Sequence, residues 1–318
     1  MDGNLVVMIT KEVAKLTQTK RKKLRVIGVP SDLGQGRRGV DMGPSAIRYA
    51  GLSEKMRDLG YEIEDVGNID VPPAESRFVG SAKVKYLEQV VSVCDELREW
   101  VRDALRHDHT PIVLGGDHSV AIGSIAGAAE ALGNLGCIWF DAHGDMNTPD
   151  TSPSGNIHGM PLAVSVGLGH QDLTHLGGIH PKLKPENVVL VGVRSIDRDE
   201  RRLIRETGIH VFTMQDVDEL GMGAVMHKAV QLASNGTAGV HLSVDLDGID
   251  PMFAPGVGTP VNGGFTYRES HLAMEVLAAA NCVTSVDFVE VNPILDEHNK
   301  TGLLTVELAA SLFGMTVI

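Results

Sequence analysis

The chain of 318 residues is 43% hydrophobic and 22% charged, which is ordinary for a globular protein and supplies enough apolar side chains for a sizeable core. It has 28 Lys and Arg against 41 Asp and Glu, so its formal net charge is −13. Such an acidic surface disfavours non-specific binding to nucleic acid or to anionic membranes, and it suits a cationic substrate or metal ions. No apolar run has transmembrane length, so the composition predicts a protein that is not embedded in a membrane.

The N-terminal segment 1–23 differs in composition from the rest of the chain. A short apolar stretch comes first and the basic run KRKK at 20–23 comes last, the opposite of the order in a secretory signal. We expect a flexible, solvated arm over residues 1–23, although such a basic run also suits an acidic partner. No repeat, low-complexity tract or linker divides the remainder, which predicts a single domain over 24–318.

The three cysteines, Cys94, Cys137 and Cys282, lie far apart in apolar surroundings, and no C-x-x-C motif occurs. A sparse, odd set of this kind indicates buried thiols in a reducing compartment, rather than a disulfide framework or a thiolate zinc site. The cysteines therefore predict a cytoplasmic protein.

Short apolar runs alternate with helical patterns along the whole chain. The predicted strands are 24–29, 61–67, 111–116, 136–142, 187–193, 209–213, 239–245 and 283–291. The predicted helices cover about 44–58, 81–107, 118–132, 197–207, 214–234, 268–280 and 300–313. This alternation predicts an α/β fold with a parallel sheet covered on both faces, either a barrel or an open doubly wound sheet. The first strand lacks G-x-G-x-x-G, which disfavours a nicotinamide site.

Polar clusters follow five of the predicted strands. They are GGDHS, DAHGD, RSIDRDE, DLDGID and EVNP. Function collects at the carboxyl ends of parallel strands, where the connecting loops leave the sheet. We therefore expect the five clusters to meet at one edge and form a single site.

Metal-ligating side chains follow three of these strands. They are His118, Asp141, His143, Asp145, Asp245 and Asp247. Within each motif the acids are separated by an even number of residues, and in an extended chain such side chains point to the same side. Four carboxylates and two imidazoles are too oxygen-rich for structural zinc and too imidazole-rich for calcium or magnesium alone. Six ligands would saturate one ion, so we predict two ions that share carboxylates and leave room for a water, with Mn(II) as the first choice.

Each of these residues alone has a simpler structural explanation. A single Asp245 suits a helix cap or a turn, a single His118 suits a bond to a backbone group, and GGD at 115–117 suits a turn. The metal site is favoured because both acid spacings and His118 follow separate core strands.

Several motifs resemble the ureohydrolase family, and within it the arginases. They are GGDHS (115–119), DAHGDMN (141–147), SPSGNIHGMP (152–161), SVDLDGIDP (243–251), GTPVNGGFTYRE (258–269) and EVNP (290–293). The metal motifs are common to the wider family, agmatinases included, whereas NTPDTSPSGNIHGMP looks like the arginase substrate loop. The opening GVPSDLGQGRRGVDMGPSAIR also resembles bacterial arginases. The match runs from about Leu24 to the C-terminus.

The resemblance implies a three-layer α/β/α fold with a central eight-stranded parallel sheet and an oligomer built from trimers, either a trimer or a hexamer. It also implies two Mn(II) ions per subunit and hydrolysis of L-arginine to L-ornithine and urea. By position, the first ion would be bound by His118, Asp141, Asp145 and Asp247. The second ion would be bound by His143, Asp141, Asp245 and Asp247.

The chemistry of a guanidinium supports the same reaction. Its carbon resists neutral water because the group is permanently protonated and resonance-stabilised, whereas a hydroxide made by two bridging metals is a sufficient nucleophile. Glu290 would hold the cation, unless it is a solvent-facing or turn acid before Asn292-Pro293. Asp145 would pass a proton to the departing amine. His158, in a Gly/Ser/Pro-rich loop, would carry protons to solvent, its alternative being a structural loop histidine.

The amino-acid end of the substrate needs polar groups of its own. Asn147 and Ser154 suit the α-carboxylate, and by resemblance Asp197 would bind the α-amino group, although a helix start also favours acids there. Thr259 would line the metal rim, with a glycine-rich turn as its alternative.

Three other functions compete with this one. An agmatinase shares the metal machinery, but agmatine has no α-carboxylate and would leave Asn147 and Ser154 without a purpose. A deacetylase-like amidohydrolase would need fewer metal-binding acids than the chain contains. An inactive binding or regulatory relative is disfavoured because all six predicted ligands are intact.

Overall fold

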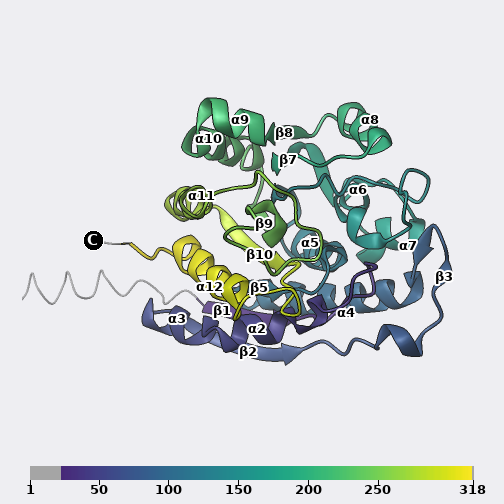
Figure 1. The fold of residues 1–318 in the computed structure, drawn as a ribbon, viewed down its shortest axis with the longest axis horizontal. Coiled ribbons are helices and arrows are strands. Elements are labelled where there is room, and N and C mark those ends of the chain that lie inside the picture. Colours follow the sequence, from purple (N-terminus) through teal and green to yellow (C-terminus); the bar gives the residue numbers. More distant parts are fainter. Residues whose placement is uncertain (1–22, 317–318) are drawn as a thin grey trace, which may run out of the picture.

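The computed structural model describes residues 23–316, so all of the expected arm except Lys23 lies outside the described residues. Within this range, eight strands form one parallel sheet (Figure 1). They are β1 (Lys23–Gly28), β2 (Glu62–Asn68), β5 (His109–Leu114), β6 (Leu135–Phe140), β7 (Leu183–Val193), β8 (His210–Thr213), β9 (Gly239–Asp245) and β10 (Val283–Val289). Each lies where a strand was predicted, with bounds that agree within two residues except that β7 starts four residues earlier. The predicted eight-stranded parallel sheet is confirmed.

The order of the strands is β2-β1-β5-β10-β9-β6-β7-β8. The sheet is open, because β2 and β8 are its two edges, so the barrel alternative is wrong. Every neighbouring pair in this sheet is parallel, and the central strands β5, β10, β9 and β6 therefore end at the same edge. This edge carries the loops that build the candidate site.

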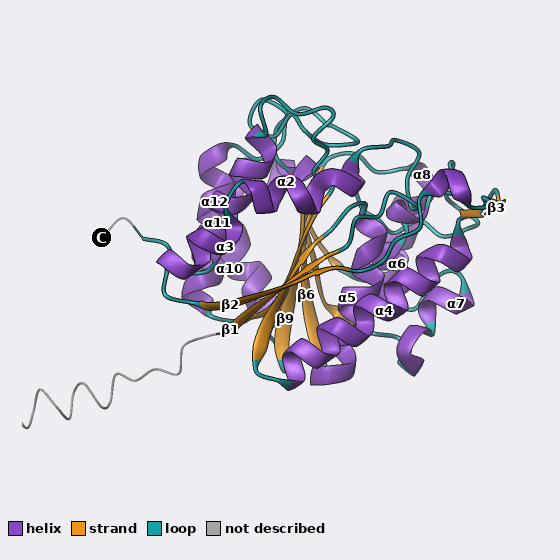
Figure 2. Ribbon diagram, turned by 90° about the horizontal axis from the view of Figure 1, so that it is seen from below, coloured by secondary structure: helices purple, strands orange, loops and turns teal. Residues whose placement is uncertain are grey.

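Helices cover both faces of the sheet, which gives three layers (Figure 2). One face packs against α4 (Leu87–Arg106), α5 (Ala121–Leu132), α6 (Pro161–Ser165), α7 (Gln171–Thr174) and α8 (Arg198–Thr207). The other packs against α2 (Gly43–Tyr49), α3 (Leu52–Asp58), α9 (Met214–Leu220), α10 (Met222–Ala233), α11 (Tyr267–Ala280) and α12 (Lys300–Leu312). Alternate strand residues enter the two layers: Ile138 and Phe140 of β6 face one, and Cys137 and Trp139 face the other. Burial on both sides explains why the strands are apolar throughout.

Three of the predicted helices differ from the observed ones. The stretch 44–58 forms two helices that are separated at residues 50–51, and 214–234 is divided at Gly221, whose φ of 82° ends α9. The predicted helix 81–107 begins only at Leu87, because residues 80–85 form a short hairpin, β3 (Gly80–Ser81) and β4 (Val84–Lys85). Periodicity located the helical regions but not the local turns that interrupt them.

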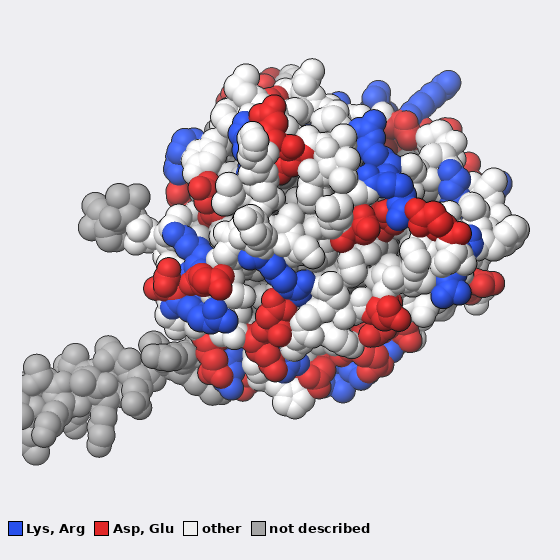
Figure 3. Space-filling model, turned by 60° about the horizontal axis from the view of Figure 1, so that its bottom comes forward, with Lys and Arg blue, Asp and Glu red and all other residues white. Residues whose placement is uncertain are grey.

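Acidic and basic side chains are interspersed on the face of the molecule shown in Figure 3. Ion pairs join Arg25 to both Glu64 and Asp103. None of the helices within residues 23–316 is long and apolar enough to span a bilayer.

Close packing between β6 and the end of α10 gives a stability prediction. A Cβ on Gly136 would lie 1.9 Å from the Ala233 carbonyl oxygen, so one of the two backbones must move. We expect Gly136→Ala to lower the free energy of unfolding by about 1–3 kcal/mol, measured by denaturant titration. The control is Gly223→Ala inside α10, where the nearest atom is 3.8 Å away and a gain of about 0.5–1 kcal/mol is expected. Equal effects of the two substitutions would contradict the packing argument.

Candidate active site

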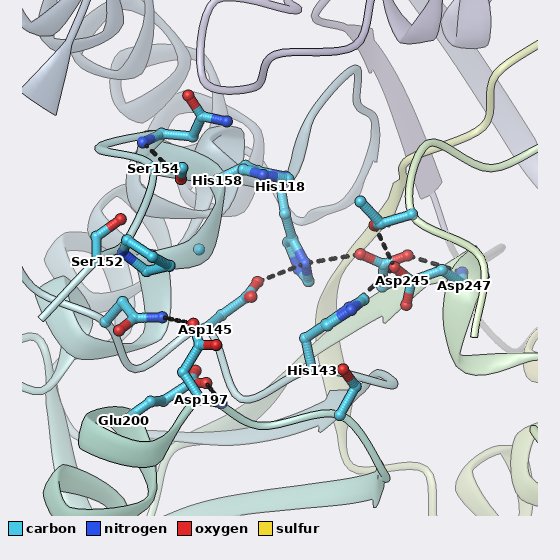
Figure 4. Close-up of a pocket in the computed structure, with 16 residues that line it drawn as sticks. His118, His143, Asp145, Ser152, Ser154, His158, Asp197, Glu200, Asp245 and Asp247 are labelled. Atoms are coloured by element: carbon cyan, nitrogen blue, oxygen red, sulfur yellow. Dashed lines mark hydrogen bonds and ion pairs between the residues drawn. The ribbon is translucent and has the colours of Figure 1, made fainter. Parts of the chain in front are cut away.

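The candidate site is a cavity at the carboxyl edge of the sheet, with a volume of about 160 Å³. Side chains from the loops after β5, β6, β7 and β9 point into it (Figure 4). All of the predicted site residues line it except Asp141 and Glu290, which are fully buried. The sequence-predicted residues are therefore brought together at one place.

Three carboxylates surround one nitrogen of His118. Its Nδ1 lies 3.2 Å from Asp141 Oδ2, 3.0 Å from Asp145 Oδ2 and 3.1 Å from Asp245 Oδ2. Nδ1 is buried, and none of these contacts has the geometry of a hydrogen bond. A nitrogen and three oxygens that converge without bonding one another have the donor set and arrangement of a metal site.

The remaining contacts of His118 fix the orientation of its ring. Nε2 lies 2.8 Å from Ser243 Oγ, and the ring stacks on the indole of Trp139 with centroids 4.1 Å apart and planes 11° apart. Trp139 Nε1 also donates to Asp141 Oδ2 at 2.9 Å. The tryptophan thus holds one imidazole and one carboxylate of the same cluster.

A second cluster shares Asp141 with the first. His143 Nδ1 lies 3.1 Å from Asp247 Oδ2 and 3.5 Å from Asp141 Oδ1. The ligand atoms of Asp141, His143 and Asp247 lie within 4.8 Å of one another, as do those of His118, Asp141 and Asp245. Two adjoining groups with one common carboxylate could hold two ions.

These contacts differ from the expected pairing in one respect. Asp247 was expected to bind both ions and Asp245 only the ion at His143, but Asp245 is the carboxylate beside His118, and Asp247 lies beside His143 alone. The i, i+2 residues also sit in turns rather than in extended chain. Asp141 Oδ1 accepts from the His143 backbone N–H at 2.7 Å, and Asp245 Oδ1 accepts from the Asp247 N–H at 2.8 Å. The second turn directs Asp245 and Asp247 to different clusters, whereas the first turn leaves His143 beside Asp141, which both clusters share.

The clusters are unfavourable without added positive charge. Burial, followed by the neighbouring Asp247 and Asp141 carboxylates, raises the pKa of Asp245 well above its usual value. Burial and Asp141 likewise raise the pKa of Asp145 to about 6. For His143 burial acts to lower the pKa, but Asp247 and Asp141 outweigh it and raise the pKa to about 12. Divalent cations would balance these carboxylates, so the residues present fit a metal centre.

Glu290 and His158 form a pair beside the first cluster. Glu290 Oε1 accepts from the His118 backbone N–H at 3.1 Å and lies 3.1 Å from His158 Nδ1, while Oε2 is buried without a partner. Burial opposes the charged form of His158, but the Glu290 carboxylate prevails and raises its pKa to about 9. A buried acceptor oxygen that bonds nothing is a ready partner for a cation.

Polar groups line the cavity away from the two clusters. Asn147 Nδ2 donates to Asp197 Oδ2 at 3.2 Å, and the Asn147 Oδ1 accepts from Thr151 Oγ1 at 3.0 Å. Ser154 lines the same cavity. At the rim of the second cluster, Thr259 Oγ1 donates to Asp247 Oδ2 at 2.9 Å, so Thr259 is more than a turn residue. Asp197 caps α8, as its alternative explanation required, and its side chain also reaches the cavity.

Sequence reasoning missed Glu200, which lines the cavity although it is almost fully buried. Its Oε1 accepts from the Met146 N–H at 3.0 Å and its Oε2 from the Asp197 N–H at 3.1 Å. Glu200 is the third residue of a capping box that begins at Asp197, a D-x-x-E pattern that was visible in the sequence. Burial raises the pKa of Glu200 to about 7.

An open α/β/α sheet with a carboxylate–imidazole centre in a cavity at its carboxyl edge defines a metal-dependent enzyme of the α/β class. Comparisons with known proteins identify the family. The model of the Arginase family matches residues 22–314. The arginase of Bacillus caldovelox is 57% identical over 294 residues, which cover 92% of this chain and 98% of that protein.

Solved structures agree with this result. The native structure of the Bacillus caldovelox arginase superposes with a TM-score of 0.91 at 56% identity, covering 93% of this chain and 100% of that one. The arginase of Entamoeba histolytica, solved in complex with L-ornithine, gives a TM-score of 0.85 at 37% identity, with coverage of 93% and 100%. The chain belongs to the Arginase family. Its members are metal-dependent hydrolases of the ureohydrolase type.

The raised pKa of Glu200 predicts a pH dependence of stability. The usual pKa of a glutamate is 4.5, and that of Glu200 in the folded chain is about 7. Between these pH values the folded chain keeps a proton on Glu200 that the unfolded chain has lost, so the free energy of unfolding falls as the pH rises. In metal-free wild-type protein this effect should lower the free energy of unfolding by up to about 1.4 kcal/mol per pH unit. Glu200→Gln should abolish this dependence on pH. Denaturant unfolding at several pH values measures it. Glu206→Gln, an exposed acid on the same helix, is the control and should follow the wild type. Parallel curves for Glu200→Gln and wild type would contradict this assignment.

Proposed function

We propose that this chain hydrolyses L-arginine to L-ornithine and urea with two Mn(II) ions held by the two clusters. The observation that carries the proposal is the pair of carboxylate–imidazole groups that share Asp141 at the base of one polar cavity. Membership of the Arginase family supports the reaction, and the ornithine complex of the Entamoeba histolytica arginase supports the product.

His118, Asp141, Asp145 and Asp245 would hold the first ion, and His143, Asp141 and Asp247 the second. The distances between their ligand atoms support this division. The mixture of imidazole and carboxylate donors suits Mn(II) better than calcium or magnesium. When bound, two such ions supply ionised water near neutral pH, the nucleophile that a guanidinium carbon requires.

Glu290 would hold the guanidinium of the substrate. Its unpartnered Oε2 can accept a guanidinium N–H, while Oε1 stays bound to the His118 backbone and His158. An oxygen of Asp145 would carry the proton to the departing amine. His158 would exchange protons with solvent, because its ring is held by Glu290 on one side and lines the cavity on the other.

The opposite end of the cavity suits an α-amino acid. The amide of Asn147 and the hydroxyl of Ser154 would bind the α-carboxylate, and the Asp197 carboxylate would bind the α-ammonium group. Thr259 would keep Asp247 in place at the rim. These contacts would select an amino acid that carries a guanidinium, rather than a simple guanidine.

We further propose a homo-oligomer, a trimer or a hexamer, in the cytoplasm, with one ureohydrolase domain over residues 24–318. These points rest on the family resemblance and on the composition of the chain. Sedimentation of the purified full-length chain measures the oligomeric state.

The substrate is tested by urea release from purified protein supplied with Mn(II). We expect kcat/KM for L-arginine to exceed that for agmatine at least tenfold, because agmatine loses charge-assisted hydrogen bonds of about 1.5–3 kcal/mol each. Equal values for the two substrates would favour an agmatinase. As a control, removal of divalent metal should abolish urea release and added Mn(II) should restore it. Turnover that persists in fully metal-free protein would refute the metal centre.

The role of Glu290 is tested by Glu290→Gln. We expect kcat/KM to fall about 100-fold or more, because the substrate cation loses a buried partner charge worth roughly 3–5 kcal/mol. Metal content should stay near normal, since Glu290 bonds the backbone of His118 and not its ring. Urea release and manganese per chain are measured together, with Glu297→Gln, an exposed acid in the following loop, as the matched control. An active Glu290→Gln enzyme would remove Glu290 from the site.

A further inference from the structure

Buried polar side chains continue from the metal centre into the layer between the sheet and helices α4 and α5. His241, Ser243 and Asp245 alternate along β9 and share one face, and Ser285 and Asp287 are the register partners of His241 and Ser243 on β10. All five are at most 3% exposed. Neither the fold nor the proposed reaction explains a histidine–aspartate pair in this layer.

Asp287 is held firmly, but only by one of its oxygens. Its Oδ2 lies 3.0 Å from His241 Nε2 and accepts from Ser124 Oγ at 2.8 Å, while His241 Nδ1 lies 2.8 Å from Ser285 Oγ. Its Oδ1 is buried with no hydrogen-bond partner. An unsatisfied buried carboxylate oxygen costs about 1–3 kcal/mol or more, so its presence calls for a function.

The hydrogen bonds of His118 supply a function for that oxygen. An ion bound at Nδ1 requires that the hydrogen of the ring sit on Nε2, so Nε2 must donate to Ser243 Oγ, 2.8 Å away. The Ser243 hydroxyl is then free to donate its own hydrogen. Asp245, the next residue on the same face of β9, has both oxygens engaged. Its Oδ1 accepts from the Asp247 N–H, and its Oδ2 faces His118. Asp287 Oδ1 is the acceptor left on the neighbouring strand.

We propose that Asp287 is a positioning residue of the metal centre, which accepts the hydrogen of Ser243 and thereby keeps His118 directed at the ion. The inference rests on the proposed function only through the metal. The structure contains no hydrogen bond between Ser243 Oγ and Asp287 Oδ1. Because the two residues are register partners on adjacent strands, a side-chain rotation of Ser243 would bring its hydroxyl toward this oxygen.

The charge of Asp287 explains why a carboxylate occupies this place. An anion behind a metal-binding imidazole makes the imidazole a stronger ligand, and the ion in turn balances the buried charge. His241 and Ser285 complete the row by fixing the other oxygen of Asp287. The row thus links one metal ligand to the interior of the sheet.

The test is the affinity of the full-length protein for Mn(II), measured by electron paramagnetic resonance of the unbound ion during titration. We expect Asp287→Ala and Ser243→Ala each to lower the affinity for one of the two Mn(II) ions about 10–100-fold and to leave the affinity for the other unchanged. The double variant should bind no more weakly than the poorer single variant, because both substitutions break the same connection. Asp287→Asn keeps one acceptor oxygen and should lose less affinity than Asp287→Ala.

Ser124→Ala is the matched control, because it removes a bond to the other oxygen of the same carboxylate. It should bind both ions like the wild type, and a loss as large as that of Asp287→Ala would assign the effect to core damage and overturn the inference. Wild-type affinity in Ser243→Ala would overturn it as well, and this variant decides the matter if Asp287→Ala does not fold. A wild-type chain that binds no Mn(II) would instead refute the proposed metal centre.

Discussion

The organising constraint of this molecule is the repulsion among buried carboxylates that the sheet brings to one point. Parallel strands β5, β9 and β6 end at the same edge, so their loops bring Asp141, Asp145, Asp245 and Asp247 together around His118 and His143. Burial and mutual repulsion push the pKa of Asp145 and Asp245 upward, and both imidazoles are drawn toward the charged form. Bound cations would relieve this repulsion, so the fold creates a site that is suited to metal ions.

The backbone solves a second problem, which is to hold acids rigidly while leaving them free to bind an ion. In Asp141 and Asp245 the two carboxylate oxygens have different partners. Oδ1 accepts from the backbone N–H two residues ahead, and Oδ2 faces His118. A side chain fixed in this way loses little freedom when an ion binds, so more of the binding free energy is retained. The turn that follows each strand is therefore part of the ligand geometry.

Sequence reasoning located the eight strands and the edge at which the site lies, because fully buried parallel strands are apolar throughout and polar residues stand out after them. It failed where the answer depends on local turns or on register. The period of two that was used for Asp245 and Asp247 applies to extended chain, and a turn instead separates them between two clusters. The neighbourhood of Ser243 and Asp287 depends on how β9 pairs with β10, which one sequence does not reveal.

The two faces of β9 show how stability and chemistry are kept apart. Val240, Leu242 and Val244 face the layer of α10 and α11 and are entirely aliphatic, whereas His241, Ser243 and Asp245 face the other layer and lead to the metal centre. A slip of one residue would exchange the two sets, burying the acid in the apolar layer and removing a ligand. The apolar set therefore fixes the register that the polar set needs. The polar face of β9 thus leads to the metal centre, and packing of its aliphatic face against the opposite helix layer keeps these ligands in register.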